Sequence, residues 1–147
     1  MDRYLVISAD CHAGLPSEQY RDWLDPAHRE AFDDYLARRQ AMIRQLMAGD
    51  DDFAVRWEEE NEEGLRGAWD ASRRDKELDG DGVAGEVIFP DADSVTGGAS
   101  PPFGAGLSGS MDVSPELAFA GARAHNRWLA DLCSTVPQPP ASSSRIC

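Results

Sequence analysis

Two short apolar runs that lie far apart in the chain constrain its fold more than any other feature. Tyr4-Leu5-Val6-Ile7 leads into a strand predicted over Leu5–Ala9, and Val87-Ile88-Phe89 lies in a second strand predicted over residues 85–90. Both runs are continuous rather than alternating, which is typical of strands covered on both faces of a parallel sheet. Strands that alternate with helical segments also indicate a parallel sheet. We therefore expect an α/β fold in which both strands have further neighbours.

The residues between the two strands carry helical patterns. Asp25-Pro26 is a good helix start, because Asp25 can cap the helix and proline is favoured at its first position. Residues 50–70 are polar and acidic, and we expect them to form a surface insertion with patchy helix. The whole helical and acidic insertion is placed at about residues 16–70. A short helix is predicted over residues 71–78.

The C-terminal part has three regions of different character. Residues 94–112 are rich in Gly, Ser and Pro and are predicted to form a long mobile loop. Ser114-Pro115-Glu116 combines a cap, a first-position proline and an acid that favours the helix dipole, so we expect a helix to about Cys133. Residues 137–147 have no periodicity and are predicted to be a disordered tail. The chain is thus divided into a structured segment, 1–136, and this tail.

The charge of the chain limits its partners. It has 27 acidic and 14 basic residues and a net charge of -13, with no basic stripe. Nucleic acid and anionic membrane surfaces are therefore not expected as partners. The acidic runs at residues 50–52 and 58–60 are typical of a solvated surface.

Hydropathy and cysteine usage indicate a cellular location. No apolar run reaches the roughly 20 residues that span a membrane, and the N-terminus is too short and too polar for a signal peptide. Cys11, Cys133 and Cys147 have no regular spacing, which argues against a disulfide scaffold and against a zinc ribbon. We expect reduced thiols and a cytoplasmic protein.

Asp10 and His12 directly follow the first predicted strand. Side chains two residues apart on a strand point to the same side, so this carboxylate and imidazole face the same way and Cys11 faces the other. The two are suitable ligands for zinc, iron or manganese. The tripeptide is common, and in the alternative interpretation Asp10 caps the following turn beside a partly buried histidine.

The strand that carries this pair resembles a known family. Tyr4-Leu5-Val6-Ile7-Ser8-Ala9-Asp10-Cys11-His12 is similar to the opening strand of the amidohydrolase-related family (amidohydrolase family 2), in the branch of aminocarboxymuconate semialdehyde decarboxylase-like enzymes. Residues 69–74 and 78–90 resemble that family's first helix and second strand, and residues 122–131 resemble the helix that follows. The blocks occur in the expected order across most of residues 4–136, which makes the resemblance more specific than the tripeptide.

The resemblance implies both a fold and an activity. The fold would be the N-terminal part of a metal-dependent-hydrolase barrel, a TIM-like β/α barrel with its metal at the C-terminal mouth. Asp10 and His12 would be first-strand ligands of a divalent metal, zinc first, with manganese or iron as alternatives. A metal-activated water would attack an amide, ester or lactone of a small-molecule substrate. Non-oxidative decarboxylation on the same scaffold is the alternative activity, and the full-length parent could be a homo-oligomer.

The chain carries only part of what the family requires. The histidines and the aspartate that later strands contribute have no counterpart here, so the catalytic residues stay unknown. A full barrel needs about 250 residues. We hypothesise that the chain is a truncated fragment whose tail, residues 137–147, arises from truncation or a frameshift. Alone it is expected to be inactive, and the alternative from another class is a catalytically silent, incompletely folded fragment.

The remaining polar residues that could carry chemistry are expected to have structural roles. His28 is predicted to be exposed in the first turn of a polar helix. His125 is expected to make a structural hydrogen bond, Cys11 to be a small packing residue, and Asp91 to be a turn residue.

Overall fold

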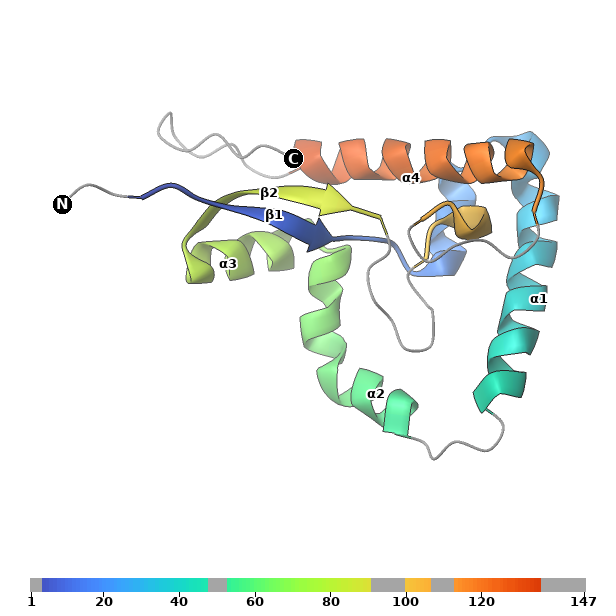
Figure 1. The fold of residues 1–147 in the computed structure, drawn as a ribbon, viewed down its shortest axis with the longest axis horizontal. Helices are drawn as coiled ribbons and strands as arrows, with labels where there is room; N and C mark the ends of the chain where they lie inside the picture. Colours follow the sequence, from blue (N-terminus) through green and yellow to red (C-terminus); the bar gives the residue numbers. More distant parts are fainter. Residues whose placement is uncertain (1–3, 48–52, 91–99, 107–112, 136–147) are drawn as a thin grey trace.

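The computed structural model describes residues 4–47, 53–90, 100–106 and 113–135. Within them, α4 runs across one end of the domain while α1 and α2 extend away from it (Figure 1). The elements in chain order are β1 (Val6–His12), α1 (Arg29–Met47), α2 (Phe53–Leu65), α3 (Ala71–Asp81), β2 (Val83–Phe89) and α4 (Pro115–Thr135). Four short 3-10 helices lie between them: η1 (Ser17–Trp23), η2 (Pro26–His28), η3 (Arg66–Ala68) and η4 (Pro102–Gly104).

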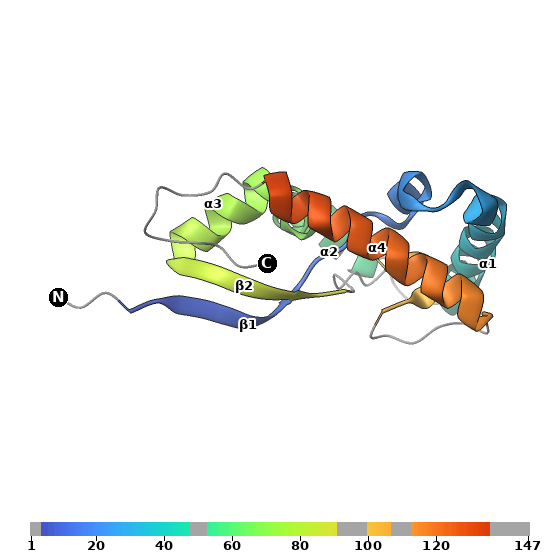
Figure 2. The ribbon, with the colours of Figure 1, turned by 90° about the horizontal axis from the view of Figure 1, so that it is seen from above.

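The two strands form a parallel two-stranded sheet. Ile7 is paired with Gly85 and His12 with Phe89, and the register shifts between Ser8 and Cys11. β1 is the outer strand, and β2 lies between it and the helices α3 and α4 (Figure 2). The apolar side chains of β1 are largely exposed, with Ile7 at 51%. The sheet therefore has one covered side and one open side.

This architecture corrects the predicted fold. The expectation of an α/β fold forming the N-terminal part of a TIM-like barrel is wrong: the described residues form a small, mainly helical domain with a single two-stranded sheet. The prediction assumed that continuous apolar strands must be covered on both faces. In the structure, the apolar residues of α1 and α4 pack mainly on the short 3-10 helices η1 and η4, and β1 keeps an open edge.

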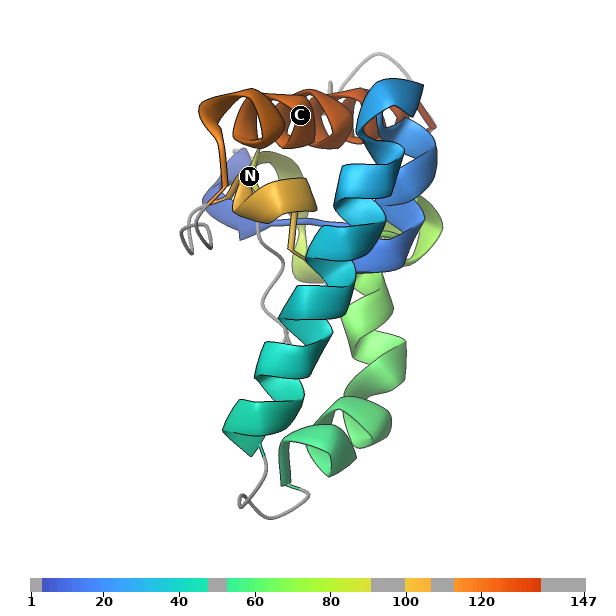
Figure 3. The same cartoon turned by 90° about the vertical axis from the view of Figure 1, so that its right-hand side faces the viewer.

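The core lies where α4 meets α1, η1 and η4. Figure 3 shows α4 crossing the upper end of α1, close to η4. Phe32 of α1 packs edge-on against Phe103 of η4 at 5.5 Å between ring centroids, and Tyr35 lies 5.4 Å from Phe103. The buried apolar residues are Ala13, Leu15, Tyr20, Leu24, Phe32, Tyr35, Phe103, Ala120, Ala124, Trp128 and Leu132. We call this set the aromatic core.

Phe103 has an unusual backbone conformation. Its φ is +59°, in the left-handed region that costs an L-residue about 1 kcal/mol or more. Its ring is fully buried between Phe32 and Tyr35. The stretch around it was predicted to be a mobile loop, and this is wrong for the described part, because Pro101, Pro102 and Phe103 are all buried.

The helix boundaries follow local signals in most places. Asp70 caps α3, since its Oδ1 accepts hydrogen bonds from the backbone N–H groups of Ser72 at 3.0 Å and Arg73 at 3.1 Å. Gly82 ends α3 in the left-handed conformation that glycine favours. The cap predicted for α4 is confirmed, because the Ser114 hydroxyl accepts from the backbone N–H of Leu117 at 3.3 Å.

Other helix predictions need correction or stay untested. Asp25 makes no capping hydrogen bond; its carboxylate binds Arg123 and Arg127 of α4 instead. The predicted patchy insertion contains one continuous helix, α2. The predicted tail at 137–147 lies outside the described residues.

Among the residues that the structure describes, no helix is both long and apolar enough to cross a membrane.

Candidate functional site

Asp10 and His12 lie at the carboxyl end of β1, where the sequence placed them. The register shift between Ser8 and Cys11 accommodates an extra residue in β1. His12 then pairs with Phe89, and its ring lies 6.1 Å from the phenyl ring. The structure brings the two predicted ligands together, with His12 Nε2 3.5 Å from Asp10 Oδ1.

The imidazole of His12 is held in one orientation by the end of β2. Its Nδ1 lies 3.0 Å from the carbonyl oxygen of Pro90. A carbonyl can only accept, so in the neutral ring Nδ1 carries the proton and Nε2 carries the lone pair. A histidine oriented in this way, by a carbonyl behind its ring, is the usual arrangement for a metal ligand.

The spacing of the two donor atoms fits a shared metal ion. Zinc binds imidazole nitrogen and carboxylate oxygen at about 2.0–2.2 Å, which places two donors of a tetrahedral ion roughly 3.3–3.5 Å apart. The observed separation of 3.5 Å lies at the upper end of that range. Both side chains are accessible, His12 at 37% and Asp10 at 84%. The distance between the two donor atoms is therefore compatible with one shared divalent transition metal.

The pair stands alone within the described part of the chain. No group of three or more His, Cys, Asp or Glu side chains that could hold a metal occurs there. A catalytic zinc site has three protein ligands and an open position, and a structural one has four. Asp10 and His12 supply two donors, so further ligands have to come from outside this group.

Cys11 points to the opposite side of β1, as the strand periodicity predicts. Its thiol donates to the Ser8 hydroxyl at 3.0 Å. The prediction of reduced thiols holds for Cys11, which is free, and is wrong for Cys133, which is disulfide-bonded. Cys11 therefore does not join the ligand pair.

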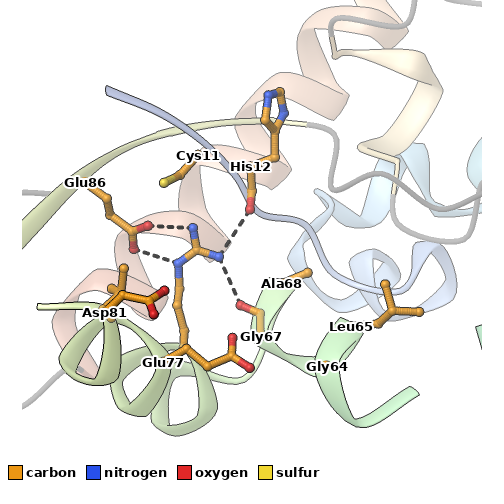
Figure 4. Close-up of a pocket in the computed structure, with 11 residues that line it drawn as sticks. Cys11, His12, Gly64, Leu65, Gly67, Ala68, Glu77, Asp81 and Glu86 are labelled. Atoms are coloured by element: carbon orange, nitrogen blue, oxygen red, sulfur yellow. Dashed lines mark hydrogen bonds and ion pairs between the residues drawn. The ribbon is translucent and has the colours of Figure 1, made fainter. Parts of the chain in front are cut away.

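The side of the sheet that Cys11 faces carries a pocket of about 330 Å³. Figure 4 shows Glu86, Glu77 and Asp81 around it, with the His12 ring turned away from it. The lining residues are Cys11, His12, Gly64, Leu65, Gly67, Ala68, Arg74, Glu77, Leu78, Asp81 and Glu86. The imidazole and the pocket thus lie on different sides of β1, and the pocket does not extend the site formed by Asp10 and His12.

Arg74 of α3 forms hydrogen bonds with three of the residues that line the pocket. Its guanidinium binds both carboxylate oxygens of Glu86, at 2.6 and 2.7 Å, and donates to the carbonyl oxygens of His12 at 3.2 Å and Gly67 at 3.0 Å (Figure 4). Both charged side chains are largely buried. Arg74 therefore fixes the backbone at the ligand pair from behind, through the His12 carbonyl.

Sequence reasoning missed this ion pair, although one signal was present. Glu86 is a lone charge inside the apolar strand β2, and a charge on a covered strand face needs a partner. Arg74 lies on α3, the helix that precedes β2 and packs on it. The helix–strand order alone could have suggested the pairing.

The other candidate residues that the structure describes have structural roles or are partly exposed. His125 is buried, and its Nδ1 lies 2.8 Å from the Tyr20 hydroxyl, which also accepts from the backbone N–H of Leu15 at 3.1 Å. The prediction of a structural hydrogen bond is confirmed. His28, in η2, is partly rather than fully exposed. Asp91 lies outside the described residues.

Comparison with known proteins adds no family to this geometry. No protein-family model, no curated protein and no solved structure matches the chain. The resemblance to the amidohydrolase-related family stays a prediction from the residue pattern.

Proposed function

We propose that the chain binds a divalent transition metal, zinc first, through Asp10 and His12, and that this pair belongs to a metal-dependent hydrolase site. The observation that supports the proposal most directly is the pair's geometry. His12 Nε2 and Asp10 Oδ1 are 3.5 Å apart, and the Pro90 carbonyl 3.0 Å from Nδ1 leaves the Nε2 lone pair available.

His12 and Asp10 would contribute different donor atoms to such a metal site. His12 offers a neutral nitrogen donor whose direction is set by Pro90 on one side and whose backbone is held by Arg74 on the other. Asp10 offers an accessible carboxylate, which a hard or borderline cation accepts readily. A zinc ion bound there would lower the pKa of a coordinated water to about 7 and so supply hydroxide at neutral pH. Hydrolysis of an amide, ester or lactone is the matching reaction class.

Zinc binding tests the metal part of this proposal. Isothermal titration of the chain with zinc chloride is expected to show binding that His12→Gln and Asp10→Asn each weaken by more than about tenfold, since even the partners behind a ligand contribute that much. His28→Gln is the matched control and is expected to leave the affinity unchanged. Equal affinities for the wild type and both ligand variants would reject the pair as the metal site.

Hydrolysis is tested separately. The zinc-loaded chain is incubated with 4-nitrophenyl acetate and with a simple aromatic lactone, and product formation is compared with that of a zinc blank. The resemblance implied that the chain alone is inactive, but a zinc ion with open positions can activate water. We therefore expect turnover above the blank that the His12→Gln variant lacks. Metal binding without any such difference would retain the metal site and reject the hydrolase assignment.

A further inference from the structure

The metal-ligand pair is incomplete in a way that a second copy of the chain can remedy. A zinc ion takes four ligands in structural sites. Asp10 and His12 supply two, and no group of three possible ligands occurs in the described part of the chain. Two copies related by a two-fold axis would supply two aspartates and two histidines, which completes a tetrahedral set.

The surroundings of the pair suit contact with another copy. Ile7 and His12 are paired with Gly85 and Phe89, so these residues share one face of the sheet, together with Val87 two residues from Phe89. On this face Val87 is 45% exposed and Phe89 37% exposed. Two accessible ligands therefore lie beside an open apolar surface, which a partner would remove from water.

The distribution of charge also favours the outer strand β1 as the region where two copies approach each other. The chain carries a net charge of -13, so most approaches of two copies meet like-charge repulsion. The stretch from Tyr4 to Ala9 has no charged residue, and the carboxylate that follows, Asp10, is the one a cation would neutralise. Glu86 nearby is already paired with Arg74. The outer strand is thus a place where two copies can approach with little repulsion.

We propose that one zinc ion joins two copies of the chain through Asp10 and His12 of each, with the apolar face of β1 and β2 at the interface. This inference rests on the metal-binding part of the proposed function and not on hydrolysis. Four protein ligands fill a tetrahedral zinc, so the joined form holds a closed, structural ion.

Sedimentation velocity with zinc chloride tests the proposal on the full chain. At half an equivalent of zinc we expect the 16.1 kDa species to convert to a species of about twice that mass, and EDTA to reverse the change. Asp10→Asn and His12→Gln are expected to abolish it, and His28→Gln to retain it. Because the Asp10 side chain is 84% exposed, Asp10→Asn leaves the packing of the chain intact. Higher salt should strengthen the dimer by screening the acidic surfaces.

Each other outcome overturns the inference in a distinguishable way. A monomeric complex with one zinc per chain rejects the metal-joined dimer and keeps the proposed metal site. A dimer that survives EDTA or the Asp10→Asn substitution shows association through the apolar face alone. An absence of zinc binding rejects the dimer and the proposed function together.

Discussion

The aromatic core and the two-stranded sheet use similar residues with opposite results. Phe32 and Phe103 in the core are completely buried, whereas Ile7 and Val87 in the sheet expose about half of their surface. Each helix presents one apolar stripe, and a second helix or a 3-10 turn can cover it. A strand presents two faces and a backbone edge, and α3 covers one of those faces. Apolar sequence alone therefore does not determine burial; the number of faces that need covering does.

The largest expected effect comes from truncating one apolar side chain in each region and comparing the two losses of stability. Phe32→Ala is expected to lower the free energy of unfolding by about 3–5 kcal/mol, because it removes a fully buried ring from contact with Phe103 and Tyr35. Val87→Ala, at a half-exposed sheet position, should cost no more than about 1 kcal/mol. Urea denaturation followed by circular dichroism gives both values. Similar losses at the two sites would contradict the contrast drawn between core and sheet.

The ion pair beneath the sheet should give the next largest effect. Glu86→Ala leaves the largely buried Arg74 guanidinium without its carboxylate, which typically costs about 3 kcal/mol. The double variant Arg74→Met with Glu86→Leu should recover most of that loss, because no buried charge remains. The two-state free energies of the single and double variants decide the matter. If the double variant is no more stable than Glu86→Ala, the cost arises from lost packing rather than from an unpaired charge.

Two glycines sharpen the comparison inside the helices. A Cβ at Gly121 of α4 would overlap the carbonyl oxygen of Pro102, so Gly121→Ala should destabilise the core by about 1–3 kcal/mol. Gly64 of α2 has open space around it, and Gly64→Ala should stabilise the chain by up to about 1 kcal/mol. Thermal unfolding of the two variants measures both effects: we expect a lower melting temperature for Gly121→Ala and a higher one for Gly64→Ala. A neutral Gly121→Ala would show that η4 is free to move away from α4.

The smallest effect is expected at the cap of α3 and depends on pH. Hydrogen bonds from the Arg73 backbone N–H and the Ser72 hydroxyl lower the pKa of Asp70 below its ordinary value of 3.8, against the effect of partial burial. Its contribution is therefore complete above that value and is lost as the pH falls through the lowered pKa. Asp70→Ala should lower the melting temperature by about 4 °C near neutral pH.

Asn is as good a cap as Asp and does not titrate, so Asp70→Asn separates the two roles. It should retain most of the melting temperature near neutral pH and show a shallower loss of stability than the wild type as the pH falls below the ordinary carboxyl value of 3.8. Melting curves across that range make the comparison. An unchanged acid slope would mean that the remaining carboxylates dominate, Asp33 beside Arg21 among them, whose pKa is also lowered.

What the sequence predicted correctly depends on short-range chemistry. The cap at Ser114 and the common facing of Asp10 and His12 each involve residues a few positions apart, and the structure agrees with both. The strands were also found, with boundaries that differ by a few residues.

What the sequence did not predict depends on complementarity between distant segments. Nothing near Phe103 in the sequence indicates that its ring is buried against Phe32. Likewise, nothing near Asp25 indicates that its carboxylate binds Arg123 instead of capping a helix. The barrel was predicted from the family resemblance and the parallel sheet from the apolar strands, and here β1 has no second neighbour among the described residues. The proximity of Asp10 and His12 could be predicted from the sequence because both residues lie on one strand.

The parallel pairing of β1 with β2 also has a consequence for the order in which the chain folds. Residues 13–82 separate the two strands, so the sheet cannot form until a long loop closes, and such non-local parallel pairing is slow. The contacts of α3 with η3 and of α4 with η4 join segments that are close in sequence, so we expect them to form faster than the sheet. In a stopped-flow refolding experiment the helical signal should therefore precede protection of the amides of β1. During that interval the uncharged stretch from Tyr4 to Ala9 is free to pair with other chains, which makes protein concentration the variable that decides how much of it refolds.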